Sequence, residues 1–226
     1  MKKTPLYFRF AEGVELFSTM KDTELPYVVI QSHQIHSNRI AIITDPTVTR
    51  DQLQGIDALI TNLRGCAIGA RTADCVPVLL YDTNHKVIAS IHSGWKGTVL
   101  KIVQCTITKM NDVFGTMPID IKAFIGPSIS ADCFQVGSEV VDAFSQSGFP
   151  MKRILKDMGI KEQDNIYSGI HIDLWEANKW LLEDAGVLPQ NIEVARICTY
   201  QNELFPSARR ERNNKCERII NSIKLI

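Results

Sequence analysis

Short apolar runs alternate with longer amphipathic segments along this chain. The short runs are rich in Val and Ile, whose β-branched side chains favour strands. We expect seven strands, at residues 27–31, 40–44, 58–61, 76–81, 87–92, 121–125 and 192–198.

Two longer segments have the spacing of an amphipathic helix. Residues 98–114 place apolar side chains on one face, and Gly115 follows them. A second helix is predicted after Asp173, which can cap it, with Glu176 three residues later as in a capping box. This helix ends at Gly186. Strands and helices interleaved in this order predict an α/β or α+β fold.

The composition is that of a folded domain. The chain has 226 residues, of which 45% are apolar, a fraction that is normal for globular proteins. Because no internal repeat, low-complexity stretch or long linker divides the sequence, we predict a single domain over residues 1–226.

The charge balance excludes several classes of partner. Lys plus Arg number 25 and Asp plus Glu number 25, so no overall field draws the chain to nucleic acid or to an anionic membrane. Pro5, Arg9 and Glu12 interrupt the first segment, and no apolar run has the length of a membrane span. We therefore expect a cytoplasmic protein that binds neither nucleic acid nor membranes, and we predict no particular oligomeric state.

Cysteine and histidine supply the candidate chemistry. The six cysteines are scattered without any C-x-x-C pair, which favours free thiols over disulfides and excludes zinc-finger and thioredoxin-like motifs. Cys75 precedes one apolar strand and His92 ends the next. An antiparallel hairpin between them would place a thiol beside an imidazole.

Two interpretations of this pair stay open. With His36 as a second imidazole, the set suits Zn²⁺ and leaves a fourth position for water or substrate. Without a metal, Cys75 would be a nucleophile and His92 its base. A lone buried cysteine usually acts as a small hydrophobic residue, but glycine and polar residues crowd around all three positions. The other histidines are expected at the surface, behind the site or in structural roles: His33, His85 and His171.

Seven stretches resemble the family labelled the laccase or polyphenol oxidase domain, whose members are described as purine nucleoside phosphorylases with adenosine deaminase activity. They span most of the chain in the family's order. The stretches are QIHSNR at 34–39, DALIT at 57–61, TADCVPVLLYD at 72–82, IHSGWKGT at 91–98, IGPSISADCFQVGSEV at 125–140, HIDLWEANKWLLEDAGV at 171–187 and CTYQNELFPSARRE at 198–211.

The resemblance implies a fold, a ligand set and an activity. The fold would be a four-layer α/β/β/α domain, related to the deamidase domain of cytotoxic necrotising factor. The family's zinc ligands, which are also its catalytic residues, fall on His36, Cys75 and His92. The implied substrates are inorganic phosphate and purine nucleosides such as adenosine, inosine and methylthioadenosine. The H-x-E and P-C-x-x-C signature of zinc deaminases is missing, so adenosine deamination would need a different proton shuttle.

The chain departs from the family pattern at several positions. Lys96 stands where the family's HAGWRG segment has arginine, and lysine lacks the bidentate fork that arginine offers a phosphate. Gln201, Pro206 and Ala208 replace residues of the CTYCN and FFSYRR segments. Because the ligand set is intact, these departures bear on substrate preference.

An anion-binding segment is predicted after the strand that ends at His92. Backbone N–H groups of residues 94–98 could bind phosphate at the start of a helix, with Lys96 adding charge, although the segment is not a P-loop. Asp74, beside the candidate thiol, is expected to orient a ligand or to shape a turn. Further candidates for binding phosphate or purine are Arg39, Arg71, Arg209 and Arg210.

Counting histidines tests the oxidase label. A multicopper oxidase needs a type 1 copper with two histidines and a cysteine, plus a trinuclear cluster that takes several more imidazoles. The chain has five histidines, which is too few, so we reject true laccase chemistry. Copper could still enter the zinc position as an adventitious substitute, because Cu²⁺ binds such sites more tightly.

Three functions follow from these interpretations. The first is a zinc-dependent purine nucleoside phosphorylase of broad specificity with adenosine deaminase activity. The second is a metal-free Cys–His hydrolase that acts on an amide such as a peptidoglycan precursor. The third is a non-catalytic nucleotide-binding module, against which the intact ligand set argues. Bound zinc would favour the first function, and metal-free protein alkylated at Cys75 the second.

Overall fold

The central element is a mixed six-stranded sheet. The structure, a computed structural model, describes residues 3–159, 169–212 and 216–226. Neighbouring strands of this sheet are antiparallel except for the two outer pairs, which are parallel. Its order is β11 (Ile192–Val194), β8 (Ile121–Ile125), β6 (Val76–Asp82), β7 (Val87–Ser93), β4 (Ala58–Thr61) and β3 (Ile40–Ile42).

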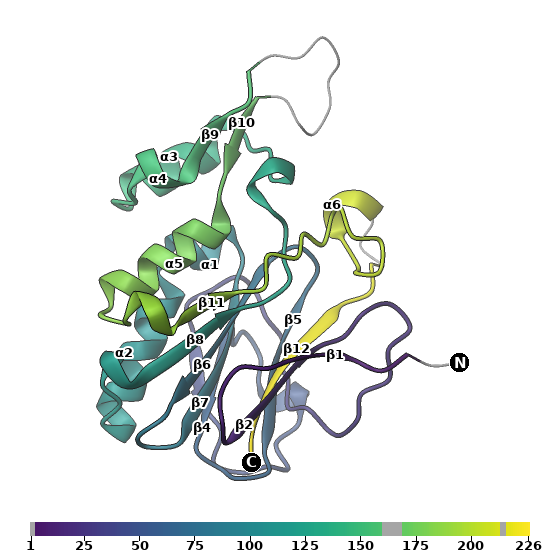
Figure 1. The fold of residues 1–226 in the computed structure, drawn as a ribbon, viewed down its shortest axis with the longest axis vertical. Helices are drawn as coiled ribbons and strands as arrows, with labels where there is room; N and C mark the ends of the chain where they lie inside the picture. Colours follow the sequence, from purple (N-terminus) through teal and green to yellow (C-terminus); the bar gives the residue numbers. More distant parts are fainter. Residues whose placement is uncertain (1–2, 160–168, 213–215) are drawn as a thin grey trace.

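A second, antiparallel sheet of four strands lies against one face of the first (Figure 1). Its order is β1 (Leu6–Phe8), β2 (Val14–Ser18), β12 (Ile219–Leu225) and β5 (Ala67–Thr72). A separate hairpin pairs β9 (Leu155–Asp157) with β10 (Ile170–Ile172).

Helices cover the other face of the six-stranded sheet (Figure 1). The helices that pack most extensively on its strands are α1 (Trp95–Val99), α2 (Ile102–Phe114) and α5 (Leu174–Asp184). The remaining helices are α3 (Ser138–Gln146), α4 (Met151–Ile154) and α6 (Ala208–Glu211), with single turns η1 (Arg50–Gln52), η2 (Pro118–Asp120), η3 (Ala131–Cys133) and η4 (Pro189–Asn191). The predicted α/β class is confirmed, and no described helix is long and apolar enough to cross a membrane.

Alternation along the strands builds two layers of core. In β6, Val78 and Leu80 pack toward the helices, whereas Leu79 and Tyr81 pack between the sheets, as the two-residue period of a strand requires. The outer face of the four-stranded sheet is covered by the segment around Val29. Both faces of each sheet are therefore covered along the strands. A functional site can open to solvent at the ends of the strands.

Several predicted elements differ from the observed ones. Residues 27–31 form no strand and make only an isolated bridge, Ile30 to Ile68. The predicted helix over 98–114 is interrupted by Lys101, whose φ of 57° ends α1 and starts α2. The strands at 40–44 and 192–198 are shorter than predicted. By contrast, Asp173 caps α5 as predicted, accepting the N–H of Glu176 at 3.0 Å.

Six strands were not predicted: β1, β2, β5, β9, β10 and β12. In the longer ones, apolar side chains are interrupted by small or polar ones, as in AIGART of β5 and IINSIKL of β12. Asn221 in β12 is fully buried and hydrogen-bonded to Ser18 and Thr72. Such a polar strand is recognisable only from its partners, because its polar residues become favourable once they are hydrogen-bonded.

The turn between β6 and β7 is organised by the fully buried carboxylate of Asp82. It accepts the N–H groups of Asn84 at 2.8 Å and His85 at 3.0 Å, and contacts Nδ1 of His85 at 2.9 Å. Burial raises the pKa of Asp82, but the side chain of Thr116 together with these hydrogen bonds outweighs burial and lowers it below its usual range.

We predict that Asp82→Asn lowers the free energy of unfolding by about 1–3 kcal/mol at pH 7. The pKa of Asp82 is lower in the folded protein than in the unfolded chain. Its carboxylate therefore stabilises the folded state fully above the unfolded pKa, about 4, and this stabilisation is lost as the pH falls through the folded pKa. Urea unfolding at several pH values measures the effect, with the exposed Asp112→Asn as control. A difference that does not shrink in acid would contradict this role.

Candidate functional site

The site begins at the β6–β7 hairpin. Pro77 in β6 lies opposite His92 in β7, and Cys75 directly precedes β6. The antiparallel pairing predicted from the sequence is therefore present, and it brings the thiol and the imidazole to the same end of the sheet. His92 is buried, with 4% of its surface exposed.

His36 is held by a loop that wraps around the carboxylate of Asp57. Asp57 accepts the N–H groups of Ile35, His36 and Ser37 at 3.2, 2.9 and 2.9 Å, and the Ser37 hydroxyl at 2.7 Å. The backbone of His36 is left-handed, with φ at 64°, which costs a residue with a side chain about 1–2 kcal/mol. The four hydrogen bonds to one carboxylate offset that cost.

The same carboxylate orients the second histidine. Asp57 Oδ1 lies 2.8 Å from Nδ1 of His92, so Nε2 is the nitrogen left for a ligand. Burial raises the pKa of Asp57, but the hydrogen bonds from His92 and Ser37 hold it well below its usual range. No role was predicted for Asp57 from the sequence. The available signal was its place just before β4, the strand that pairs with β7.

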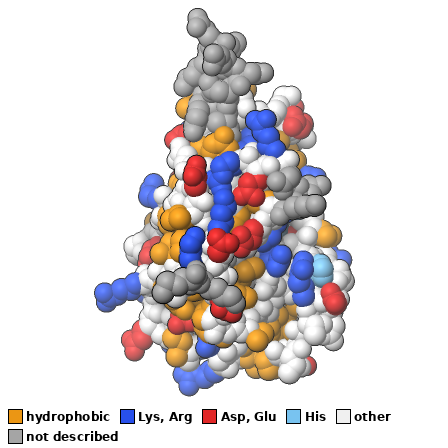
Figure 2. All heavy atoms as spheres, turned by 90° about the vertical axis from the view of Figure 1, so that its right-hand side faces the viewer, with side chains coloured by type: hydrophobic (Ala, Val, Ile, Leu, Met, Phe, Trp, Pro, Cys, Tyr) orange, Lys and Arg blue, Asp and Glu red, His pale blue; other side chains and the backbone are white. Residues whose placement is uncertain are grey.

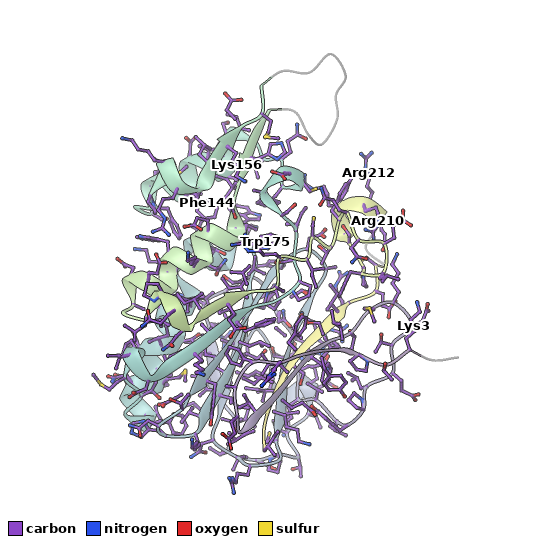
Figure 3. The ribbon with its side chains drawn as sticks, in the orientation of Figure 1. Lys3, Phe144, Lys156, Trp175, Arg210 and Arg212 are labelled. Atoms are coloured by element: carbon purple, nitrogen blue, oxygen red, sulfur yellow. The ribbon has the colours of Figure 1, made fainter. Side chains whose placement is uncertain are left out.

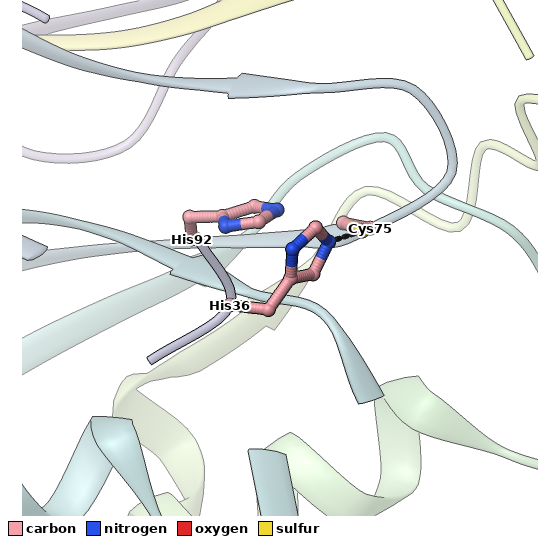
Figure 4. A group of neighbouring side chains, drawn as sticks. All are labelled: His36, Cys75 and His92. Atoms are coloured by element: carbon pink, nitrogen blue, oxygen red, sulfur yellow. Dashed lines mark hydrogen bonds between the residues drawn. The ribbon is translucent and has the colours of Figure 1, made fainter. Parts of the chain in front are cut away.

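The three ligand atoms converge. Those of His36, Cys75 and His92 all lie within 4.8 Å of one another, and Cys75 Sγ is 3.7 Å from His36 Nε2 (Figure 4). Burial raises the pKa of the Cys75 thiol, but the two histidines outweigh burial and lower it to about 6. Burial lowers the pKa of His92, yet Cys75 and Asp57 raise it to about 9.

This donor set fits a metal ion. Bonds of 2.0–2.3 Å place two ligands of a tetrahedral zinc ion roughly 3.4–3.6 Å apart, close to the separation of Cys75 Sγ and His36 Nε2. The set combines two imidazoles with a thiol whose pKa is already lowered, and metal binding requires the thiolate. Three side chains leave further coordination positions open.

Gly94 packs directly against the cluster. A Cβ at this position would lie 2.8 Å from Cδ2 of His36 and 2.9 Å from Sγ of Cys75, closer than real Cβ contacts come. Only glycine therefore allows the start of α1 to approach the two ligands this closely.

A cavity of about 540 Å³ opens onto the cluster. Its described lining includes three arginines and no aspartate or glutamate. The lining residues are Ser32, Gln34, His36, Arg50, Arg71, Thr72, Ala73, Cys75, His92, Ala208, Cys216 and Arg218.

The predicted substrate-binding residues divide into two groups. Arg71 lines this cavity, whereas Arg39, Lys96 and Arg209 are not among its described lining residues. Nζ of Lys96 lies 5.5 Å above the ring of Trp95. The predicted strand-to-helix segment 94–98 is present, but it does not bring Lys96 to the cavity wall.

Two of the predicted arginines bind the protein itself. Arg209 donates from its guanidinium to the carbonyl of Gln135 at 3.0 Å and stacks on Phe134. Arg210, labelled in Figure 3, donates to the carbonyls of Thr199 and Tyr200. These contacts tie α6 to neighbouring loops.

Asp74 links the ligand turn to the C-terminal segment. Its backbone is left-handed, with φ at 84°. Its carboxylate accepts hydrogen bonds from Thr199 Oγ1 at 2.6 Å, Ser207 Oγ at 3.0 Å and the N–H of Arg209 at 2.7 Å. Asp74 therefore fixes the turn that carries Cys75, because its carboxylate binds the first turn of α6 and the segment that leads into this helix.

The remaining histidines lie apart from the cluster formed by the described residues. His33 contacts Asp51 and His85 contacts Asp82. His171 is buried, with Nδ1 at 2.7 Å from the carbonyl oxygen of Ala131.

Comparisons with known proteins point to one family and cover most of the chain. The family model described as "Multi-copper polyphenol oxidoreductase laccase" matches residues 15–226. A purine nucleoside phosphorylase of Bacteroides thetaiotaomicron is 43% identical over 195 residues, covering 83% of this chain and 70% of that protein. "Adenosine deaminase RL5", from an unknown prokaryotic organism, is 38% identical over 80% of this chain and 70% of its own. The crystal structure of the Bacillus licheniformis hypothetical protein YfiH has a TM-score of 0.81 at 28% identity, covering 94% of this chain and 93% of that one.

We predict that Asp57→Asn weakens zinc binding by about 10- to 100-fold, because losing the partner of a ligating histidine typically has that effect. Competition with a chromophoric chelator measures the zinc affinity. Asp51→Asn is the matched control, since Asp51 contacts His33 at the surface. Unchanged zinc affinity in Asp57→Asn would contradict the orienting role.

We also predict that Gly94→Ala weakens zinc binding by about tenfold or more, because the added Cβ pushes His36 and Cys75 apart. Gly97→Ala is the control in the same segment, since its Cβ would meet nothing nearer than 3.4 Å. Zinc content after dialysis and the melting temperature separate loss of the site from loss of the fold. Equal behaviour of the two variants would refute the steric argument.

Proposed function

The chain belongs to the family described as multi-copper polyphenol oxidoreductase laccase, and from this membership we propose that it is a zinc-dependent purine nucleoside phosphorylase that also deaminates adenosine. Relatives in the family are named purine nucleoside phosphorylase or adenosine deaminase. The observation that carries the proposal is the convergence of His36, Cys75 and His92 on a cavity of about 540 Å³.

His36, Cys75 and His92 would hold the zinc ion. When bound, the ion supplies a Lewis acid and lowers the pKa of water. Asp57 keeps His92 oriented for this role through Nδ1. Copper could replace zinc adventitiously at the same donors.

Phosphorolysis exchanges one bond of the nucleoside for another. A phosphate oxygen forms the bond to C1′ of the ribose while the bond from C1′ to the purine nitrogen breaks. The electron pair leaves with the purine, which takes up the proton that hydrogen phosphate gives up, and ribose 1-phosphate is the second product. The protein contributes by holding both reactants in line in one cavity. A pocket of a few hundred Å³ suits ligands of this size.

Deamination of adenosine uses the same cavity differently. Water adds at C6 of the purine, ammonia departs, and inosine remains. Because the described lining includes no carboxylate, the proton shuttle differs from the glutamate of zinc deaminases. We propose broad specificity toward adenosine, inosine and methylthioadenosine.

We do not propose laccase chemistry. Two of the five histidines lie in the cluster, while the other three contact Asp51, Asp82 and Ala131. These positions provide no trinuclear copper cluster among the described residues.

A second candidate function rests on the pKa values of the site. A thiol with a pKa of about 6 beside an imidazole with a pKa of about 9 forms a thiolate–imidazolium pair, and Asp57 orients the imidazole. This is the arrangement of a cysteine hydrolase, which would act on an amide such as a peptidoglycan precursor. A nucleotide-binding module without activity is the third alternative.

One experiment separates the three functions that involve nucleosides: phosphorylase, deaminase and nucleotide-binding module. The protein is incubated with adenosine, inosine and methylthioadenosine, with and without phosphate, and the products are identified by chromatography. Phosphate-dependent release of purine supports the phosphorylase, and conversion of adenosine to inosine without phosphate supports the deaminase. Binding without turnover would favour the nucleotide-binding module.

We predict that Cys75→Ala loses most of its zinc and its activity together, because the N₂S set is broken. Cys105→Ala is the control, since Cys105 is a free cysteine outside the cluster. Elemental analysis and the product assay measure both quantities. Full zinc occupancy in Cys75→Ala would refute the ligand assignment.

The pH dependence distinguishes the metalloenzyme from the hydrolase. Zinc competes with protons for its ligands, so activity and zinc occupancy should fall together as the pH drops. Removal by a strong chelator should abolish activity, and added zinc should restore it. A pH–rate profile that is unchanged in the metal-free protein would support the thiolate–imidazolium pair instead.

A further inference from the structure

Three arginines from distant parts of the chain meet on one cavity wall. Arg50 begins η1, Arg71 lies in β5, and Arg218 directly precedes β12. Register explains why two of them are neighbours: Ile220 lies opposite Arg71, so Arg218, two residues earlier, projects on the same face of the sheet. Diagonal neighbours of this kind lie within reach of long side chains.

Among the residues that the structure describes, this positive cluster has no acidic partner. Arg50 donates to the carbonyl of Ser32 at 3.3 Å, Arg71 to the side-chain oxygen of Gln31 at 3.0 Å, and Arg218 to the carbonyl of Cys216 at 2.7 Å. Across residues 3–159, 169–212 and 216–226, none of the three forms an ion pair. Each guanidinium has five N–H donors, so most remain for a ligand.

One arginine elsewhere in the molecule is neutralised by two carboxylates. Arg153 forms ion pairs with both Glu176 and Glu183. On the face shown in Figure 2, Lys and Arg side chains stand among Asp and Glu. By contrast, burial together with repulsion from Arg50 and Arg218 lowers the pKa of Arg71. Like charges brought together without counter-charge are unfavourable, and a bound anion would relieve the repulsion.

We propose that Arg50, Arg71 and Arg218 form the binding subsite for inorganic phosphate. The inference rests on the proposed phosphorolysis for the identity of the anion. Arginine presents a planar fork that binds phosphate oxygens in pairs, and the described lining has no carboxylate to repel a dianion. Because the His36–Cys75–His92 cluster lines the same cavity, a nucleoside would lie between the metal ligands and the arginines.

This subsite replaces the segment predicted from the sequence. Gly94 caps the short helix α1 over residues 95–99, and none of residues 94–98 belongs to the described cavity lining. The charge of Lys96 lies over Trp95. Phosphate specificity therefore depends on residues far apart in sequence, and the exchange of arginine for lysine at position 96 leaves this subsite untouched.

The test measures phosphate binding directly, in zinc-loaded protein without nucleoside, by equilibrium dialysis with labelled inorganic phosphate. Arg71→Gln and Arg218→Gln should each weaken binding by about tenfold or more, because each removes charge-assisted hydrogen bonds. Arg50→Gln should weaken it as well. Zinc content and melting temperature confirm that each variant is folded, and Arg71→Lys should recover part of the affinity by restoring charge without the fork.

Arg64→Gln is the matched control, because Arg64 is exposed and precedes β5 at the end opposite Arg71. It should bind phosphate within about twofold of the parent protein. Lys96→Gln tests the competing site. If Lys96→Gln loses phosphate binding while the three arginine variants keep it, the proposed subsite is wrong.

Measuring ribose 1-phosphate formation alongside phosphate binding distinguishes failure of the subsite from failure of the phosphorylase proposal. If phosphate binds through the arginines but no ribose 1-phosphate forms from any nucleoside, the subsite stands and the phosphorylase proposal fails. If ribose 1-phosphate forms with unchanged phosphate dependence in the arginine variants, the subsite fails and the phosphorylase proposal stands. If adenosine monophosphate binds through the arginines and free phosphate does not, the assignment to inorganic phosphate is overturned.

Discussion

The carboxylate of Asp57 is the interaction on which the candidate site depends. It binds three backbone N–H groups and a hydroxyl of the His36 loop, and it orients His92 from the adjacent strand. Two ligands that are 56 positions apart in the chain are thereby fixed by one group. Because a buried carboxylate is costly unless its oxygens are satisfied, the loop conformation and the imidazole orientation stabilise one another.

Around this group, the ligands differ in their access to solvent. His92 is buried, Cys75 is half-buried and His36 is exposed. The cluster therefore has one rigid candidate ligand on the sheet, His92, and one on a loop at the cavity, His36. The loop ligand is where strain is stored, since the left-handed backbone of His36 persists only through the bonds to Asp57. His92 thus provides the rigid position, and His36 provides the position that solvent can reach.

Local patterns made part of this structure predictable. The hairpin that joins Cys75 to His92 consists of two continuous apolar runs, so its register and the proximity of its ends follow from the sequence. The roles of Asp57 and Arg218 depend instead on partners far away in the chain. β12 itself is missed because Asn221 and Ser222 break its apolar pattern. The metal and substrate roles of the predicted site residues stay predictions until they are measured.

The placement of β12 between β2 and β5 has a consequence for folding. This strand pairs with residues 14–18 and 67–72, so the four-stranded sheet closes only through contacts of large sequence separation, which form late. The three candidate metal ligands, by contrast, all lie within residues 36–92. During synthesis they emerge well before Arg218 and β12. The His36–Cys75–His92 cluster and the three cavity arginines therefore belong to different stages of assembly. A growing chain can hold the candidate metal ligands before its cavity is complete.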